Sequence, residues 1–408
     1  MYDLLIKNGT LATHDSVFPG AIAVKGGKIS AVFSPCTDSL PQAEVVIDAT
    51  GKIVMPGCID SHVHIQEPGY TYGEDFASGT MAAAAGGITT ILEHPLSNPP
   101  VRDRDTFLLK LGLAQEKAYI DFGLWGALLP DNLKQVKDLF DLGCVAVKGF
   151  ISYAGEDYPS IPDSVLYDVL KDLKDYPGAV VSVHAENLEM SETGIRRLQE
   201  SGRTDPIAHL ESRESIVELE AISRAVLFAK ETGGRLHIVH MSIAEGAELI
   251  KRAKQEGVRV TVETCPHFLM ADSDMLREKG PFAKMTPPLR RPHNREALWD
   301  YIKDGTIDFI ASDHVPLTYE EKSAGLEDIW RAPNGIPGVE TFVPLMIDGC
   351  LNRRGIPLTR FVQLMSTNAA KVFGLYPKKG SLLPGSDADF TIFDRHKKWV
   401  YHSRERYN

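Results

Sequence analysis

Apolar and polar residues follow one pattern at the two ends of the chain and another in its middle. Near the N-terminus, β-branched runs are interrupted by Asn-Gly, Gly-Gly and Thr-Gly-Lys turns, as in residues 4–13, 21–33 and 44–57. This alternation predicts short strands joined by tight turns. The same texture returns at residues 379–394. We therefore expect one small β unit to which both ends of the chain contribute.

The middle of the chain, about residues 56–375, alternates short apolar runs with amphipathic segments. The apolar runs are too short and too rich in β-branched residues for helices, so they predict buried strands. Seven of them cover residues 88–95, 120–129, 145–150, 179–186, 236–242, 258–265 and 307–314, and an eighth precedes His62. Segments 215–234 and 244–257 predict helices, the first ending in a Gly pair suited to a helix C-cap. Eight β units favour an α/β fold of the closed (β/α)8 type, a TIM barrel, over an open sheet.

Composition narrows the class of protein. The 408 residues are 43% hydrophobic and 24% charged, with a net charge of −11, which is typical of a globular protein. No basic stripe supports nucleic-acid binding. The N-terminus lacks the apolar core of a signal peptide, and no apolar stretch is long enough to span a membrane. Five scattered cysteines indicate reduced thiols in a cytoplasmic protein rather than a metal site.

The first candidate for a metal site is the segment Asp60-Ser61-His62-Val63-His64. Residues i and i+2 of a strand project on the same face, so His62 and His64 would present two imidazoles together. In a barrel, the carboxyl ends of strands carry the active site. Two such histidines can be half of a metal site, although a pair of surface histidines would look the same.

Polar residues also end four other predicted strands: Lys148, His184, His240 and Asp313. Each replaces the Val or Ile that a barrel core would favour, and their repetition at strand ends points to one shared metal site. Lys148 is anomalous, because an ammonium beside divalent cations is strongly unfavourable. Either it pairs with an anion elsewhere, or carboxylation by CO2 has turned it into a carbamate that can bridge two metals.

The segments PGCIDSHVH, VAVKGF, SVHAEN, VHMS and ASDHVP resemble the amidohydrolase superfamily, in its branch of cyclic amidohydrolases. That branch includes hydantoinases, dihydropyrimidinases, allantoinases and dihydroorotases. The resemblance implies a barrel flanked by a β-sandwich. It would divide the chain into residues 1–55 (sandwich, first part), 56–375 (barrel) and 376–408 (sandwich, second part). It also implies a homo-oligomer, a dimer or tetramer.

The resemblance further implies two divalent metals, usually Zn²⁺. His62, His64 and Asp313 would bind the more buried metal, His184 and His240 would bind the second, and carboxylated Lys148 would bridge them. The implied reaction is hydrolysis of a C–N bond in a small cyclic amide by a hydroxide held between the metals. Asp313 would act as general base and then as general acid. Tyr153, five residues after Lys148, would bind the oxyanion, although it could be an ordinary loop residue.

The substrate ring is predicted from Gln66 and from two groups of sequence motifs. Dihydroorotases carry Arg at the position of Gln66, and neutral Gln offers no charged fork for a carboxylate. KMTPPLR and APNGIPGVE resemble hydantoinase motifs in which the backbone of Thr286 and Asn334 would bind the ring's imide. EPG, EHPLSNPP and VETCPHFL resemble allantoinases. We therefore expect a hydantoin-like ring, selected by loops 65–75, 94–98 and 152–160, with dihydroorotase as the alternative.

Three other classes compete with this interpretation. Non-catalytic scaffold relatives lack the metal ligands, whereas all six positions are retained here. A mononuclear deaminase would lack the bridging lysine, and a Schiff-base aldolase using Lys148 would not need the four histidines.

Relatives usually continue beyond the position of Asn408, and HSRERYN supplies no closing strand, so we expect a small domain that could be incomplete.

Overall fold

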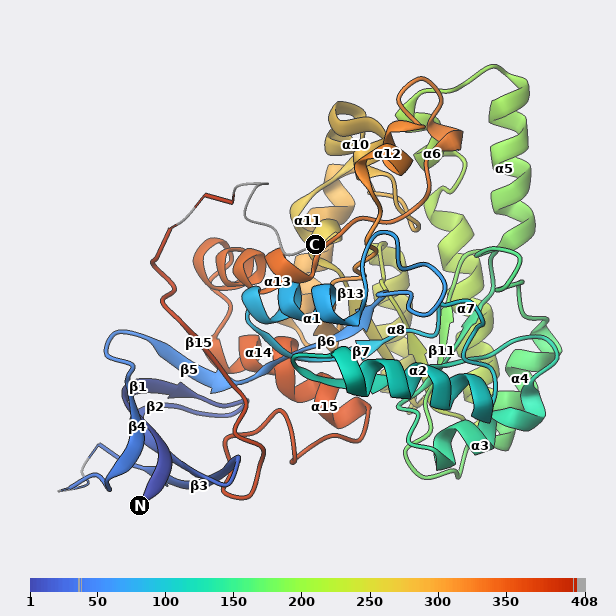
Figure 1. Ribbon diagram of the computed structural model, residues 1–408. Helices are drawn as coiled ribbons and strands as arrows, with labels where there is room; N and C mark the ends of the chain where they lie inside the picture. Colours follow the sequence, from blue (N-terminus) through green and yellow to red (C-terminus); the bar gives the residue numbers. More distant parts are fainter. Residues whose placement is uncertain (36, 38, 399, 402–408) are drawn as a thin grey trace.

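The computed structural model describes residues 1–35, 37, 39–398 and 400–401, and Figure 1 shows their arrangement. HSRERYN, residues 402–408, lies outside the described residues, as does Cys36. The other four cysteines, at positions 58, 144, 265 and 350, are buried and unpaired, which agrees with the expected reduced thiols.

Both ends of the chain contribute to one small sheet, as predicted. Its strands are β1 (Tyr2–Ala12), β2 (Val17–Lys25), β3 (Lys28–Phe33), β4 (Ala43–Asp48), β5 (Ile53–Pro56) and β15 (Phe390–Phe393). The strand order is β15-β5-β1-β2-β3, with β4 paired to β1. Strands β15 and β5 are antiparallel, so the C-terminal part closes one edge of the N-terminal sheet. Gly26 and Gly27 supply the positive φ angles of the β2–β3 turn.

A parallel barrel forms the rest of the molecule. Its strands are β6 (Cys58–Val63), β7 (Ile88–Glu93), β8 (Asp121–Leu124) with β9 (Gly126–Ala127), β10 (Val147–Phe150), β11 (Val181–His184), β12 (Leu236–Ile238), β13 (Val260–Thr264) and β14 (Phe309–Ile310). Each coincides with one of the predicted strand regions. Strands β10 and β11 are buried at every position, as expected of barrel strands covered by helices outside and packed side chains inside.

Two junctions close the barrel. The backbone amide of Trp125, between β8 and β9, donates to Glu93 at 2.9 Å, and that of Gly126 donates to Ala146 at 2.9 Å. These bonds join the three-stranded sheet β6-β7-β8 to the six-stranded sheet β9–β14. On the other side, the amide of His64 donates to the carbonyl of His314 at 2.8 Å. The predicted TIM barrel is confirmed.

Helices surround the barrel. They are α1 (Phe76–Ala85), α2 (Arg104–Lys117), α3 (Val136–Asp141), α4 (Asp163–Asp172), α5 (Leu188–Glu200), α6 (Pro206–Glu211), α7 (Ser215–Thr232), α8 (Ala244–Gln255), α9 (Pro266–Met270), α10 (Ser273–Lys279), α11 (Pro292–Lys303), α12 (Tyr319–Ser323), α13 (Val339–Met346), α14 (Leu358–Val362) and α15 (Asn368–Val372). Short 3-10 turns include η2 (Gly280–Ala283) and η3 (Ile329–Arg331). The two predicted helices are α7, which ends at left-handed Gly233, and α8. None of the described helices is both long and apolar enough to cross a membrane.

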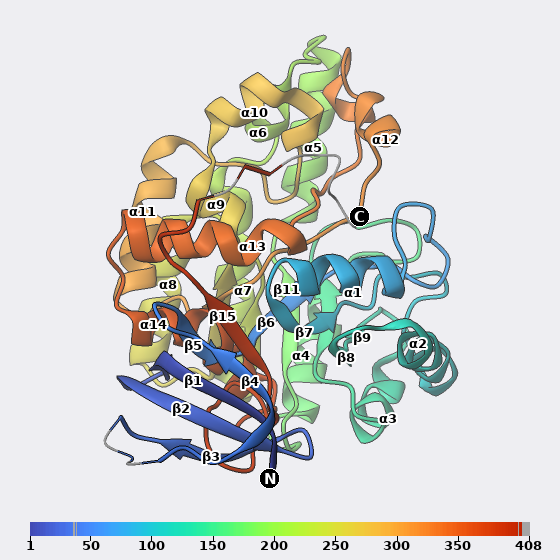
Figure 2. The ribbon, with the colours of Figure 1, turned by 60° about the vertical axis from the view of Figure 1, so that its left-hand side comes forward.

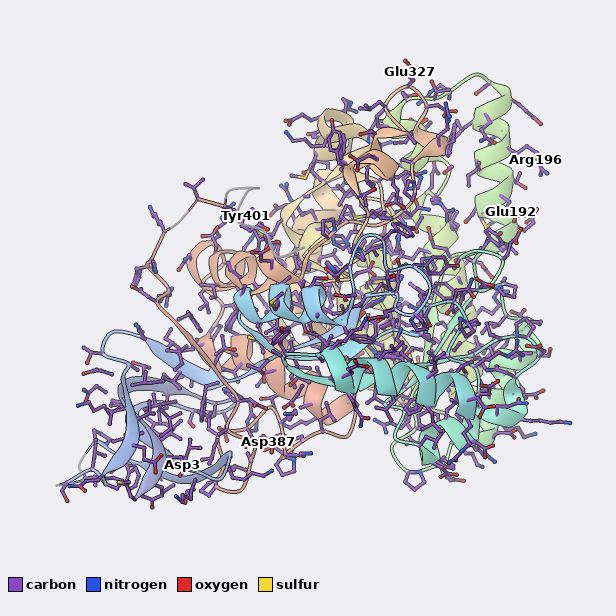
Figure 3. The ribbon with its side chains drawn as sticks, viewed as in Figure 1. Asp3, Glu192, Arg196, Glu327, Asp387 and Tyr401 are labelled. Carbon is purple, nitrogen blue, oxygen red and sulfur yellow. The ribbon has the colours of Figure 1, made fainter. Side chains whose placement is uncertain are left out.

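The layout separates the small sheet from the loops that follow the barrel strands. Helices α5 and α6 follow β11, α10 follows β13, and α12 follows β14. In Figures 1 and 2 these four helices gather at one end of the molecule, and the small sheet lies at the other. Tyr401, labelled in Figure 3, donates a hydrogen bond to Glu340 of α13 at 2.7 Å, so the chain after β15 returns over that helix.

Candidate metal centre

Three predicted ligand atoms converge inside the carboxyl end of the barrel. His62 Nε2 lies 3.1 Å from His64 Nε2, and the Oδ1 atom of Asp313 lies 3.1 Å from the first and 3.3 Å from the second. Zinc bonds of about 2.0–2.2 Å at angles near 90–110° place ligand atoms roughly 2.8–3.6 Å apart. The donor set and its spacing therefore fit one divalent cation.

A buried carboxylate that the sequence analysis missed orients these ligands. Glu263, at the end of β13, contacts His62 Nδ1 at 2.5 Å and His237 Nε2 at 3.3 Å. Burial opposes its charge, but His62 and the hydrogen bonds from His237 and His62 hold the pKa of Glu263 well below its usual range. An ionised carboxylate on Nδ1 fixes the tautomer that leaves His62 Nε2 free to bind a metal.

Lys148, His184 and His240 were predicted to complete the site. The rings of His184 and His240 meet edge to face with centroids 4.5 Å apart, and His240 Nδ1 is buried without a partner in the described part of the chain. His184 Nε2 lies 2.7 Å from Glu186, which Arg213 contacts at 3.1 Å. The carboxylate thus holds one ring nitrogen of His184 and leaves Nδ1 for a metal.

Lys148 is buried within β10, with 1% of its surface exposed. Among the described residues, no carboxylate lies within ion-pairing distance of its Nζ, so the structure gives no support to a pairing elsewhere. Burial lowers the pKa of Lys148 to about 7, so much of it is a neutral amine near neutral pH. A neutral amine is the form that reacts with CO2.

His64 and Asp313 are also in the protonation states that metal ligation requires. Burial lowers the pKa of His64 to about 4, so its imidazole is neutral at physiological pH. Burial raises the pKa of Asp313, but the charge of His62 and the hydrogen bond from His64 outweigh it and lower the pKa to about 2. Both His240 and Asp313 have positive φ angles, 40° and 50°, a strained backbone that is often found at functional sites.

His94 is a further imidazole beside the site, and the sequence analysis assigned it to a loop. It is fully buried, and both of its ring nitrogens lack a partner among the described residues. Its ring stacks on His62 with centroids 3.7 Å apart and planes 2° from parallel, and on Trp125 at 4.1 Å. A cation in the plane of His62 would lie well outside the parallel plane of His94. His94 therefore supports His62 by stacking, and Asp313 completes the ligand set better.

The three loops predicted to select the ring come together. The hydroxyl of Tyr158 accepts from the amide of Ser97 at 2.8 Å. Tyr70 donates to Asp157 at 2.9 Å, and the amide of Asn98 donates to the carbonyl of Pro68 at 2.9 Å. Loops 65–75, 94–98 and 152–160 are thus one connected surface.

Gln66 begins this surface in a fixed conformation. Its φ is +64°, and its amide donates to Glu93 at 3.0 Å. Glu93 is buried and pairs with Lys110 at 2.9 Å. The side chain of Gln66 has no hydrogen bond to another described residue, so it is available to a ligand.

The other predicted substrate residues lie on loops at the same end of the barrel. Thr286 is half-buried after η2, and Asn334 is exposed after η3. Their segments meet, because the amide of Gly335 donates to the carbonyl of Lys284 at 3.1 Å. Tyr153 is 56% exposed on the loop after β10 and makes no hydrogen bond within the described residues.

Two other groups of potential ligands are less suited to a metal. Cys265 and His267 lie beside Asp313, but burial raises the pKa of the Cys265 thiol well above its usual value, which opposes the thiolate that a metal needs. Asp121, Asp387 and Asp389 form an acidic group near the small sheet, where Figure 3 labels Asp387. Lys379 contacts all three carboxylates and offsets their charge.

Comparison with known proteins identifies the family. Residues 53–406 match the model of the amidohydrolase family, so the chain belongs to it. It is 39% identical to a protein named allantoinase from Deinococcus radiodurans, over 96% of this chain and 86% of that protein. The L-hydantoinase (dihydropyrimidinase) structure from Arthrobacter aurescens superposes with a TM-score of 0.92 at 36% identity, covering 96% of this chain and 86% of that one. A D-hydantoinase structure superposes equally well, at 34% identity over 100% of this chain and 89% of its own.

The role of Glu263 can be tested directly. We expect Glu263→Gln to weaken zinc binding about 10–100-fold, since a neutral amide no longer fixes the charge and tautomer of His62. Competition with a fluorescent chelator measures this affinity. Glu263 would not be an orienting residue if the variant bound zinc as tightly as the wild-type protein.

Proposed function

We propose that this protein hydrolyses the C–N bond of a hydantoin-like ring, as a metal-dependent cyclic amidohydrolase of the hydantoinase or allantoinase type. The observation that carries the proposal is the convergence of His62, His64 and Asp313 within 3.3 Å of one another, near a buried lysine that forms no ion pair among the described residues. Burying so many polar side chains costs free energy, which a non-catalytic scaffold protein would not need to spend.

Six side chains would hold two divalent cations, with zinc as the proposed metal. His62, His64 and Asp313 would hold the more buried one, His184 and His240 the second, and Lys148 as a carbamate would bridge them. When bound, the cations would supply Lewis acidity for the ring carbonyl and make water nucleophilic near neutral pH. The carbamate would replace a buried positive charge by a negative one where cations are to be held.

Asp313 is the proposed proton carrier. Its low pKa keeps it ionised at neutral pH, so it can accept a proton from the attacking water. Oδ1 faces the two histidines, and Oδ2 takes part in no hydrogen bond of the described residues. The same carboxyl group would then deliver the proton to the leaving ring nitrogen.

The remaining predicted residues would bind and orient the ring. Backbone groups of Thr286 and Asn334 would pair with the imide, since their segments are already joined. Tyr153 would donate its hydroxyl to the oxyanion, a group that benefits from a fixed donor. Its exposed hydroxyl has no partner among the described residues and lies on the loop that follows Lys148.

The ring is proposed from Gln66 and from the relatives. Gln66 has donors and an acceptor for amide or ureido groups but no charge for a carboxylate, which disfavours dihydroorotate. Allantoin is a substituted hydantoin, and the 39% identity to an allantoinase makes it the first ring to test. We also propose a homo-oligomer, a dimer or tetramer, and a cytoplasmic location, with a small cyclic amide as the partner.

A substrate panel tests the proposal. Metal-replete protein should open allantoin or a 5-substituted hydantoin, and a chelator should abolish that activity. Dihydrouracil and dihydroorotate complete the panel. Activity confined to dihydroorotate would contradict the role given to Gln66. Failure on every ring by a protein with its metals bound would contradict the proposed function.

We expect Asp313→Asn to lower kcat by several orders of magnitude without loss of the fold. An amide can still occupy the ligand position, but it cannot accept the proton. Steady-state kinetics and circular dichroism separate the two effects. Near-normal turnover in a correctly folded variant would remove Asp313 from the proton path.

The pKa of Lys148 predicts how activation depends on pH. As pH rises through about 7, the neutral amine replaces the ammonium, so carboxylation should become faster. Metal-free protein given zinc and bicarbonate should therefore gain activity more quickly at pH 8 than at pH 6, at equal dissolved CO2. Lys148→Ala is the control and should show no bicarbonate dependence. A rate that is equal at both pH values would contradict the carbamate.

A further inference from the structure

Lys322 of α12 is buried, with 4% of its surface exposed, and its side chain ends among backbone carbonyls. Its Nζ donates to the carbonyl of Lys284 at 2.8 Å, of Pro333 at 3.1 Å and of Gly335 at 2.8 Å. Pro333 and Gly335 lie on either side of Asn334, and Lys284 lies two residues before Thr286. The amino group of one lysine therefore joins the two segments proposed to bind the imide.

Further contacts hold the same two segments. Lys284, also 4% exposed, donates its Nζ to the carbonyls of Ile329 at 2.9 Å and Ala332 at 2.5 Å. A nitrogen of buried His209 lies 2.8 Å from the carbonyl of Met285, directly before Thr286. The Thr286 segment is thus held by His209 as well, while both lysine side chains donate to the segment that contains Asn334 or to the η3 turn before it.

The lysine-bound segment continues to the metal ligands. The amide of Val315 donates to the carbonyl of Ile336 at 3.0 Å, and the amide of Gly338 donates to His314 Nδ1 at 2.9 Å. Residues 335–338 therefore run beside the two residues that follow Asp313. Gly335 has a φ of +122°, and a Cβ there would lie 2.7 Å from Val315, so the close approach requires glycine.

Helix α12 itself belongs to the loop that begins at Asp313. Thr318 caps it, with Glu321 completing a capping box, so Lys322 is presented from a fixed first turn. Figure 3 labels Glu327 at the outer tip of the loop that joins α12 to η3. The lysine points inward from this loop while the tip faces away.

We propose that Lys322 is a positioning residue that sets the distance between the Thr286 and Asn334 backbones and fixes both relative to Asp313. The inference rests on the proposed function, because it assigns the ring's imide to those two segments. Burial lowers the pKa of Lys322 to about 7, and the charged form of its amino group offers three donors, which matches the three carbonyl oxygens around it. Such a link would set how well the ring is bound, and hence KM, without touching the metal ligands.

The experiment compares Lys322→Met with Lys254→Met. Methionine keeps an unbranched apolar side chain but removes the donors. Lys254, on α8, donates to the carbonyl of Thr306 at 2.7 Å and pairs with Asp308 at 2.7 Å, before the amino end of β14 and away from the proposed site. It is a control for the loss of a lysine that binds backbone.

For the ring that wild-type protein opens fastest, we expect Lys322→Met to raise KM at least tenfold. Metal content should stay at the wild-type value, and kcat should fall less than threefold. Hydrogen exchange should become faster at the amides of Thr286 and Asn334. Lys254→Met should leave KM and these two amides unchanged. Lys322→Arg, which retains donors, should restore part of the lost affinity.

Two outcomes overturn different claims. A wild-type protein that opens no ring would overturn the proposed function. An active wild-type protein together with an unchanged KM in Lys322→Met would overturn only the positioning role. If Lys322→Met does not fold, Lys284→Met replaces it, because it removes the two reciprocal bonds between the same segments. An unchanged KM in that variant would likewise overturn the inference.

Discussion

The closed parallel barrel is the constraint on which the site depends. Closure brings the ends of strands far apart in sequence to one place, so ligands from β6, β10, β11, the end of β12 and the end of β14 meet. The closing contact is itself part of the site, since the amide of His64 bonds to the carbonyl of His314, the residue after Asp313. Loss of this junction would separate His64 from Asp313.

Buried carboxylates behind the candidate ligands hold those ligands and a neighbouring loop in position. Glu263 orients His62, Glu186 orients His184, and Glu93 holds the backbone of Gln66 while it pairs with Lys110. Removing one partner of such a buried pair typically costs about 3–5 kcal/mol, because the other charge is left without compensation. These contacts position the candidate ligands before any metal binds, which would limit the reorganisation that the proposed catalysis requires.

The sequence predicted the barrel strands well, and it singled out candidate metal ligands for a physical reason. A polar residue at the end of an apolar run breaks the pattern expected of a core strand, as at His184 and Asp313. Glu263 and His94 carried no comparable signal, since their role depends on contacts with His62 from distant strands. The hydrogen bonds of Lys322 could not be predicted from the sequence either. Lysines are common on surface helices, and only the fold shows that this side chain is buried. For Tyr153, the sequence predicted the loop on which it lies but not the direction of its side chain.

We propose that the buried side chains hold two cations rather than one. Calorimetric titration of metal-free protein with Zn²⁺, in bicarbonate buffer and with metal analysis of the product, tests it most directly. We predict two tightly bound ions per chain, falling to one or fewer in Lys148→Ala. A single ion per wild-type chain, with full hydrolytic activity, would contradict the proposed site for two cations.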